Sequence, residues 1–291
     1  MTDDPFVTHR GLLFTVAYEM LGSAADAEDV LQESWLRWDQ VDRSEVRDER
    51  AYLVRIVTRQ ALNHLRTMSR RRESYVGEWL PEPLLTSPDV ADDVELAESV
   101  SIAMLTVLET LGPTERAVFV LREVFDVPYD EIAAAVDKSP AAVRQIAHRA
   151  KDHVAARRPR VTVDRAEQEA VVARFLTAVN SGDLQGLMDV LAPDVVSVAD
   201  GGGLVKGAAL RPIHGADKIA RYLLGGLAKL ALPFEARPTW VNGHPAIRGE
   251  VDGELAGAIC FEIEGDRITR IFSIANPDKL GRMDEAAHLV R

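Results

Sequence analysis

The sequence contains a single cysteine, Cys260, among 291 residues, which excludes an intrachain disulfide and a cysteine-rich zinc site. It also lacks any run of the roughly 18 apolar residues needed to span a bilayer. The acidic start, residues 1–5, has none of the basic character that opens a secretory signal. These absences predict a soluble globular chain that acts in the cytoplasm, makes no membrane contact and needs no metal or cofactor.

The composition is that of an ordinary globular protein. Hydrophobic residues make up 47% of the chain and charged residues 27%, close to the globular averages of roughly 45–50% and 25%. Wholesale disorder and collagen-like repeats are therefore excluded. At roughly 100 to 200 residues per domain, the length predicts two or three domains, each with its own core.

Charge is unevenly distributed along the chain. The net charge of −12, taken alone, argues against nucleic-acid binding, which depends on Lys and Arg. However, residues 55–72 hold six Arg and no acid, residues 73–101 hold eight acids and no Lys or Arg, and residues 138–160 hold seven basic residues and one acid. Because the local field decides whether a polyanion docks, DNA binding stays open, alongside the alternative of two solvated helix faces.

The first block of sequence is predicted to be helical. Ser23 followed by an acidic turn is typical of a helix start. A later helix, residues 49–68, buries an apolar stripe and leaves its arginines for the outer edge. Prolines then interrupt the periodicity in residues 73–93, which we interpret as an acidic linker. Its Trp79 and paired leucines indicate either a docking site or a loop packed on its own domain.

A second helical part follows the linker. Periodicity predicts helices over residues 94–111 and 115–124, and then two helices, 129–136 and 140–154, across a three-residue turn. That arrangement is typical of a helix-turn-helix, with Ser139 as N-cap and Pro140 opening the second helix. Its apolar stripe faces inward and leaves polar residues outside that can reach bases or phosphates. An ordinary helical hairpin is the alternative.

The last part, residues 161–291, has a different pattern. Helices are predicted over 166–179, 183–191 and 217–230, followed by strands over 235–241, 246–251, 256–262 and 267–274 that are separated by hairpin signals. Helices followed by an antiparallel meander predict a separate α+β domain. With 14 Lys and Arg against 18 Asp and Glu, its net charge is −4, so we do not expect it to bind nucleic acid.

Three stretches of the helical part carry a family resemblance. Residues 26–37, Asp-Ala-Glu-Asp-Val-Leu-Gln-Glu-Ser-Trp-Leu-Arg, resemble the core-polymerase-binding helix of bacterial sigma factors of the extracytoplasmic-function (ECF) family. Residues 51–66 resemble the helix that recognises and melts the promoter −10 element, and residues 111–119 with the helix-turn-helix resemble the domain that reads the −35 element. The resemblance covers about residues 5–158 and implies two partners, promoter DNA and core RNA polymerase through its β′ clamp helices and β subunit.

The resemblance also assigns roles to individual side chains. An acidic and aromatic set suits a protein interface and is expected to contact core polymerase: Asp29, Gln32, Glu33 and Trp35. The set expected near the −10 element comprises Arg55, Arg59, Asn63, Arg66, Arg70, Arg71 and Arg72, with Asn63 helping to hold an extruded base. The set expected at the −35 element comprises Arg144, Gln145, His148, Arg149, Arg157 and Arg158.

The α+β part is similar to the cone-shaped SnoaL-like domain fused to one group of these sigma factors. Three segments carry this similarity: residues 79–84, Trp-Leu-Pro-Glu-Pro-Leu, residues 200–203, Asp-Gly-Gly-Gly, and residues 276–280, Asn-Pro-Asp-Lys-Leu. The basic residue that often follows the triple glycine is replaced here by Leu204. The similarity implies that this domain contacts the sigma domains and tunes their activity without a separate anti-sigma protein. The expected regulatory residues are Trp79, Leu80, Pro81, Asp200, Gly201, Gly202, Gly203, Asn276, Pro277, Asp278, Lys279 and Leu280.

The predicted fold is therefore multidomain. Two all-α sigma domains, residues 1–72 and 94–158, are joined by the linker 73–93 and followed by an α+β SnoaL-like domain, residues 161–291. Lys279 and Glu82 are a candidate ion pair between this last domain and the linker. The acidic stretch from 73 to 98 is a candidate shield. It could fold against either of the two basic stretches, residues 55–72 and 138–160, and so weaken DNA binding.

Cone folds commonly contain a pocket, and the candidate lining residues here are Asp194, Asp200, His214, Trp240 and His244. Isomerases of this fold pair a carboxylate base with an oxyanion donor such as Tyr, and Tyr222 is the only tyrosine after residue 160. We therefore favour ligand sensing over catalysis and predict that the chain is not an enzyme. The alternative function is a helix-turn-helix regulator fused to a ligand-binding or enzymatic SnoaL-like domain.

Overall fold

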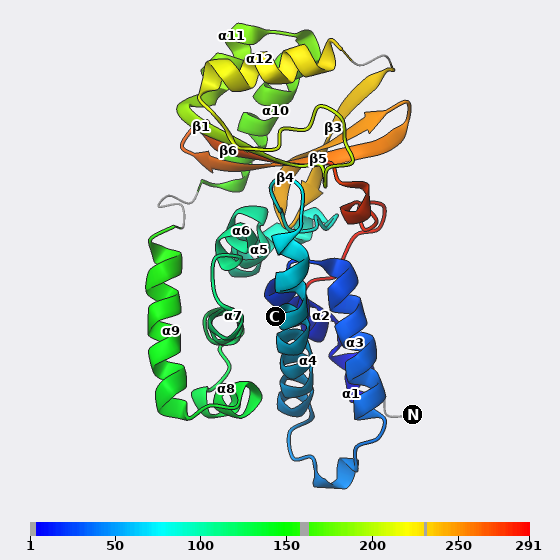
Figure 1. Ribbon diagram of the computed structural model, residues 1–291, viewed down its shortest axis with the longest axis vertical. Coiled ribbons are helices and arrows are strands. Elements are labelled where there is room, and N and C mark those ends of the chain that lie inside the picture. Colours follow the sequence, from blue (N-terminus) through cyan, green and yellow to red (C-terminus); the bar gives the residue numbers. More distant parts are fainter. Residues whose placement is uncertain (1–3, 158–162, 230–231) are drawn as a thin grey trace.

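The computed structural model describes residues 4–157, 163–229 and 232–291, except for the side chains of residues 69–73. The helical domains occupy one end of the molecule and a six-stranded sheet with its covering helices occupies the other (Figure 1). Within the described ranges, no helix combines the length and the apolar character needed to cross a bilayer.

The first helical domain is a bundle of α1 (Pro5–Thr8), α2 (Arg10–Leu21), α3 (Ala24–Trp38) and α4 (Glu49–Glu73), with a short 3-10 turn at Arg43–Glu45. Helices α2, α3 and α4 pack against one another. Gly22 ends α2 in the left-handed conformation, with φ of 70°, and the hydroxyl of Ser23 accepts from the amide of Asp26 to start α3. The predicted helix start at Ser23 is thus confirmed.

The linker is ordered by contacts with other parts of the chain. Apart from a 3-10 turn at Pro88–Asp92 it forms no helix, yet Leu80 and Leu84 are each only 1% exposed. Leu80 packs in a core with strands of the third domain, and the amide of Thr86 donates to the carbonyl of Trp240 at 3.1 Å. Of the two interpretations left open for this segment, docking onto another domain is the one observed.

The second helical domain consists of α5 (Val94–Val100), α6 (Ile102–Leu108), α7 (Pro113–Phe119), α8 (Tyr129–Val136) and α9 (Pro140–Ala155). The prediction of one helix over 94–111 is wrong, because Ser101 ends α5 and its hydroxyl caps α6 at the amide of Met104. The predicted helix 115–124 begins earlier, at Pro113, and becomes a π-helical turn at Val120–Val124.

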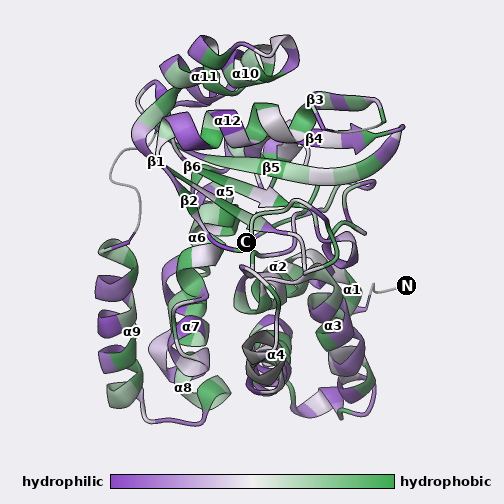
Figure 2. Ribbon diagram, turned by 45° about the horizontal axis from the view of Figure 1, so that its top comes forward, coloured by the Kyte–Doolittle hydropathy of each residue, from purple (hydrophilic) through white to green (hydrophobic). Residues whose placement is uncertain are grey.

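The helix-turn-helix is confirmed. Helices α8 and α9 pack together across a turn in which Asp137 adopts a positive φ of 56°. The hydroxyl of Ser139 accepts from the amide of Ala142, which fixes the start of α9. Helix α9 lies at the outer edge of the molecule in both views, and hydrophilic and hydrophobic residues alternate along it (Figures 1 and 2).

The third domain combines α10 (Arg165–Ser181), α11 (Leu184–Val190) and α12 (Ala216–Leu227) with one sheet in the order β2-β1-β6-β5-β4-β3. The predicted antiparallel meander is confirmed as β3 (Phe234–Val241), β4 (His244–Val251), β5 (Glu254–Glu264) and β6 (Arg267–Ile274). Sequence reasoning missed β1 (Leu191–Asp200), which runs parallel to β6, and the short β2 (Ile213–His214).

The two faces of this sheet have different neighbours. Helices α10, α11 and α12 cover one face (Figure 1), with Phe175, Ile219 and Ile271 in a shared core. The other face meets the helical end of the molecule, where Phe272 and Cys260 share a core with Leu80 of the linker and Ile102 of α6. The sheet is therefore a layer between its own helices and the two helical domains.

The chain end returns to the first domain. Leu289 is buried in the core of the helical domains, and the amide of Val290 donates to the hydroxyl of Thr15 at 3.1 Å. Arg291 pairs with Asp93 and Glu95, and Arg165 pairs with Asp92. These three acids thus pair with arginines outside the two basic stretches, residues 55–72 and 138–160. The side chains of residues 70–72, 158 and 160 lie outside the described residues, so the shielding hypothesis stays a prediction.

Candidate interaction surfaces and the interdomain junction

Helix α3 presents the expected acidic surface. Asp29, Gln32 and Glu33 are exposed, and Glu33 accepts from the side-chain amide of Gln60 on α4 at 2.6 Å. Trp35 is half-buried and packs edge-to-face on Phe6, with ring centroids 5.3 Å apart. The next residue, Leu36, is 57% exposed. Anionic groups thus surround an aromatic and an aliphatic side chain, which matches the make-up of a protein interface.

Helix α4 carries the arginines that were expected near the −10 element. Arg55 lies over the ring of Tyr52, and Arg66 donates to the side chain of Asn63 at 3.2 Å on the exposed side. Arg59 is exposed but its guanidinium donates to the carbonyl of Ala134 in α8 at 2.8 Å. Part of this surface is therefore covered by the second helical domain. The side chains of Arg70, Arg71 and Arg72, at the end of α4, lie outside the described residues.

Helix α9 exposes the side chains that were expected at the −35 element. Arg144, Gln145, His148 and Arg149 all point outward, whereas Val143, Ile146, Ala147, Ala150 and Val154 are buried. Arg157 is exposed and donates to the carbonyl of His153 at 3.2 Å. Arg158 lies outside the described residues. One face of α9 is thus free of packing and offers guanidinium and amide groups.

Three segments that are far apart in the sequence meet around Asp200, which is fully buried. Its Oδ2 accepts from the amide of Leu80 at 2.9 Å and from Nζ of Lys279 at 2.7 Å. Lys279 Nζ also donates to the carbonyl of Leu80 and lies 3.4 Å from the ring centroid of Trp79. The linker, the glycine loop (residues 200–203) and the tail (residues 276–291) are thereby joined through one buried ion pair.

Tyr75 and the glycine loop complete this contact. The hydroxyl of Tyr75 donates to Oδ1 of Asp200 and accepts from the side-chain amide of Asn276 at 2.8 Å. Burial, together with the Asp200 carboxylate, raises the pKa of Tyr75. Gly202 has a φ of +60°, and a Cβ there would lie 2.6 Å from the Asn276 amide nitrogen, so only glycine fits. Leu204, at the position where the family often has a basic residue, is exposed.

The predicted ion pair between Lys279 and Glu82 is wrong, because the structure gives each side chain a different partner. Lys279 pairs with Asp200 as described above. The carboxylate of Glu82 accepts from the amides of Ala24 and Ala25, at 2.7 and 3.2 Å, and from the Ser23 hydroxyl. The linker therefore caps the positive N-terminal end of α3, the helix expected to bind polymerase.

Sequence reasoning missed the role of Asn242, which it had treated only as part of a hairpin signal. Asn242 is fully buried with a φ of 53°. Its amide nitrogen donates to the Tyr18 hydroxyl at 2.7 Å and to the carbonyl of Val100 at 2.6 Å, and its oxygen accepts from the amide of Leu84 at 2.8 Å. Tyr18 in turn donates to the carbonyl of Glu82. One side chain of the third domain thus joins both helical domains and the linker.

A second buried cluster links the two helical domains and was also missed. Arg116 of α7 is 2% exposed; its Nε donates to the carbonyl of Glu19 at 3.0 Å and its Nη1 to Glu109 at 2.8 Å. The Glu19 carboxylate accepts from the Ser99 hydroxyl at 2.9 Å. Burial raises the pKa of Glu19 to about 8 and lowers the pKa of Arg116 to about 9. No sequence pattern distinguishes these charges from surface ones.

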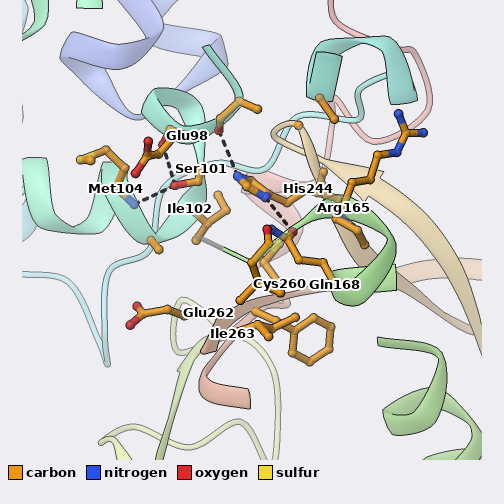
Figure 3. A pocket seen from close by; sticks show the side chains of 18 of the residues that line it. Glu98, Ser101, Ile102, Met104, Arg165, Gln168, His244, Cys260, Glu262 and Ile263 are labelled. Carbon is orange, nitrogen blue, oxygen red and sulfur yellow. Dashed lines mark hydrogen bonds between the residues drawn. The ribbon is translucent and has the colours of Figure 1, made fainter. Parts of the chain in front are cut away.

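The pocket expectation is only partly met. Trp240 and His244 line a cavity of about 430 Å³ between the third domain and helices α5 and α6 (Figure 3). Asp200 does not line this cavity because it is buried against Lys279, and Asp194 and His214 are exposed elsewhere on the sheet. The prediction is wrong for those three residues. Tyr222 donates to the carbonyl of Gly207 on an exposed surface.

Comparisons with known proteins identify the helical domains. The family model "Sigma-70 region 2" matches residues 6–71, and "Sigma-70, region 4" matches residues 101–154. The chain is 38% identical to the ECF RNA polymerase sigma factor SigJ of Mycobacterium tuberculosis (strain ATCC 25618 / H37Rv), over 94% of this chain and 91% of that protein. It is 34% identical to the probable ECF RNA polymerase sigma factor SigI of strain CDC 1551 / Oshkosh, over 94% and 92%.

The similarity extends over the third domain. The crystal structure of Mycobacterium tuberculosis extracytoplasmic function sigma factor SigJ matches with a TM-score of 0.76 and 34% identity, covering 94% of this chain and 96% of that one. Fold and matched regions define a sigma-70-type initiation factor with a fused SnoaL-like α+β domain. The chain belongs to the ECF RNA polymerase sigma factors, alternative sigma factors that direct transcription initiation.

We predict that replacing Arg116 by Met lowers the free energy of unfolding by about 3–5 kcal/mol, because it leaves the Glu109 carboxylate and the buried carbonyl of Glu19 without their donor. Glu19→Gln is expected to cost less, since the amide keeps the Ser99 contact. A folded-state pKa near 8 against an ordinary 4.5 means that the Glu19 contribution is present at acidic pH and declines as the pH rises toward 8. Urea unfolding across this range tests both statements.

The exposed Arg221→Met, in a helix-surface pair with Asp217, is the matched control and should change stability by less than about 0.5 kcal/mol. A loss for Glu19→Gln as large as for Arg116→Met would contradict this account of the cluster.

The Asp200–Lys279 pair predicts strong coupling. Asp200→Asn and Lys279→Met should each destabilise the chain, because each leaves one buried charge uncompensated. The double variant should lose less than the sum of the two, with a coupling free energy of about 1–3 kcal/mol. Thermal unfolding of the four proteins measures it, and additive losses would show that the two charges do not act as a pair.

Proposed function

We propose that this sigma factor contacts the β′ clamp helices of core polymerase through α3, the promoter −10 element through α4 and the −35 element through α9. We further propose that the third domain regulates these contacts in cis, by holding the two helical domains together. No enzymatic role is assigned to the third domain, because its carboxylate candidate Asp200 is already engaged by Lys279 and three further donors.

The chemistry of the three helices supports these assignments. Exposed arginines on α4 and α9 suit phosphates and base edges, and α3 presents acids around Trp35 and Leu36. The acidic side chains on α3 would repel DNA, so a basic protein surface is the better partner. The overall charge of −12 is no obstacle, since the basic groups are concentrated on two helices.

The packing of α4 against α7 and α8 is the observation that carries the regulatory proposal. Helices in contact have axes only about 8–10 Å apart. At roughly 3.4 Å per base pair, two promoter elements about 25 base pairs apart are separated by roughly 85 Å. One chain cannot reach both elements in this arrangement, so the two helical domains must separate before initiation.

The third domain is placed to oppose that separation. Asn242 bonds to Tyr18 in the first helical domain and to Val100 in the second. The tail adds Leu289 to the core of the helical domains and pairs Arg291 with Asp93. Separating the helical domains requires that these contacts break or rearrange. The third domain thereby acts as a built-in clamp that makes a separate inhibitor unnecessary.

Substitutions on α9 should weaken promoter binding, because each arginine that is removed takes a guanidinium away from the DNA-facing side of the helix. Arg149→Ala and Arg144→Ala are each expected to lower run-off transcription several-fold. The salt dependence of promoter binding should fall by about one counterion for each phosphate that is no longer neutralised. Arg221→Ala, on a helix of the third domain, is the control. Unchanged transcription and an unchanged salt slope for both α9 variants would remove α9 from the DNA interface.

Loosening the clamp should favour polymerase binding. Asn242→Ala removes the bonds to Tyr18, Val100 and Leu84 and is expected to raise the affinity for core enzyme several-fold in a pull-down titration. The control is Thr177→Ala, which removes only a bond within α10. An Asn242→Ala protein that is fully folded yet binds core enzyme no better would refute the clamp.

Removing residues 276–291 should change run-off transcription differently from removing everything after residue 160.

A further inference from the structure

The cavity of about 430 Å³ lies between two domains, outside the space enclosed by the third domain's own helices. One wall comes from α5 and α6, with Ile102, Met104 and Val107. The opposite wall comes from the third domain, with Trp240, His244 and Cys260. Figure 3 shows Ile102 of the first wall near His244 and Cys260 of the second. We call this cavity the interdomain pocket. Its volume lies within the roughly 300–1,000 Å³ typical of small-molecule sites.

Most polar groups of the interdomain pocket are engaged within the protein. His244 has Nε2 3.1 Å from the carbonyl of Ala97 and Nδ1 3.2 Å from the side-chain oxygen of Gln168, and burial lowers its pKa. Arg165 pairs with Asp92 and Glu169 and lies over the ring of Trp240. These groups shape the pocket without offering a free charge.

Glu262 of β5 differs from them. Its side chain is only 13% exposed, and Arg270 lies 4.0 Å from its carboxylate, at the limit of an ion pair. Burial raises the pKa of this carboxyl by more than Arg270 and a hydrogen bond from the Thr269 side chain lower it, so a cation placed beside it would relieve the cost of its burial. The apolar walls and this weakly compensated carboxylate together favour a ligand with an apolar body and a positive charge.

We propose that the interdomain pocket binds a small amphipathic amine, with the apolar body between Ile102 and Cys260 and the ammonium group at Glu262. An anionic ligand would meet carboxylates of both walls, Glu98 and Glu262, and binds more weakly. Because the walls belong to different domains, the complete pocket exists only while α5 and α6 lie on the sheet. A bound amine therefore stabilises this arrangement by mass action.

The consequence for transcription rests on the proposed function. If the helical domains must separate, an amine that stabilises their docking on the third domain lowers the affinity for core polymerase. Binding itself requires no polymerase and is measured on the sigma factor alone, so the two claims can fail separately.

The test uses the full-length chain and three probes of equal size that differ in charge: phenylbutylamine, phenylbutanol and phenylbutyrate. Isothermal titration and the shift of the thermal transition report binding. We expect the amine to bind about tenfold or more tightly than the alcohol, since a hydrogen bond to a charged group exceeds a neutral one. The carboxylate is expected to bind weakest.

Two variants locate the site. Glu262→Gln keeps the shape and removes the charge, so the preference for amine over alcohol should fall to about unity. Ala103→Phe places a ring in the pocket, where Ala103 is a lining residue, and should weaken all three probes about tenfold. Glu254→Gln, an exposed residue at the start of the same strand, is the control and should leave every affinity unchanged.

Several results would overturn the proposal. They are the absence of binding by the amine up to millimolar concentration, equal binding of all three probes, or an amine preference that survives Glu262→Gln in a protein with an unchanged thermal transition. Amine binding that leaves the affinity for core polymerase unchanged would overturn the coupling to transcription, while the binding site itself would stand.

Discussion

The arrangement of the domains depends on the hydrogen bonds of one buried amide, Asn242. It uses both of its amide protons and its oxygen on three different parts of the chain, at Tyr18, Val100 and Leu84. A buried amide without partners is costly, so these bonds form together or the hairpin moves away from the helical domains. Asn242 also tolerates the positive φ that this turn requires. The hairpin between β3 and β4 thus sets the position of the third domain on the sigma domains.

Charged groups at the junctions have roles that their surface counterparts lack. Glu82 caps α3, the helix that we propose contacts core polymerase, Lys279 neutralises Asp200, and Arg116 links α7 to the backbone of α2. Each is buried or nearly so. Buried ion pairs add little net stability compared with apolar packing, but removing one partner is strongly destabilising. Such junctions therefore favour one specific docking geometry over many approximate ones.

Local signals in the sequence predicted what is local in the fold. Apolar periodicity and the caps at Ser23 and Ser139 place the helices, and glycine turns place the meander of β3 to β6. These local signals failed for the residues and strands whose contact partner lies far away in the sequence. Strand β1 follows α11 without a turn signal and pairs in parallel with a strand some 70 residues later. Asn242 resembles any hairpin residue until Tyr18, 224 positions earlier, lies beside it. Family motifs marked Lys279, but the choice between Glu82 and Asp200 depends on tertiary geometry.

The interface between the two helical domains combines apolar and polar contacts. Residues of α4 and α7 belong to one shared apolar core, and Arg116 adds a buried hydrogen bond to the carbonyl of Glu19. The proposed separation exposes the apolar part at about 25 cal/mol for each Å², whereas water or DNA can satisfy the polar groups afterwards, so that breaking their bonds costs less than their number suggests. Core polymerase therefore has to cover the exposed apolar surface as well as bind its own contact residues, and a pocket ligand that favours the docked arrangement acts against it.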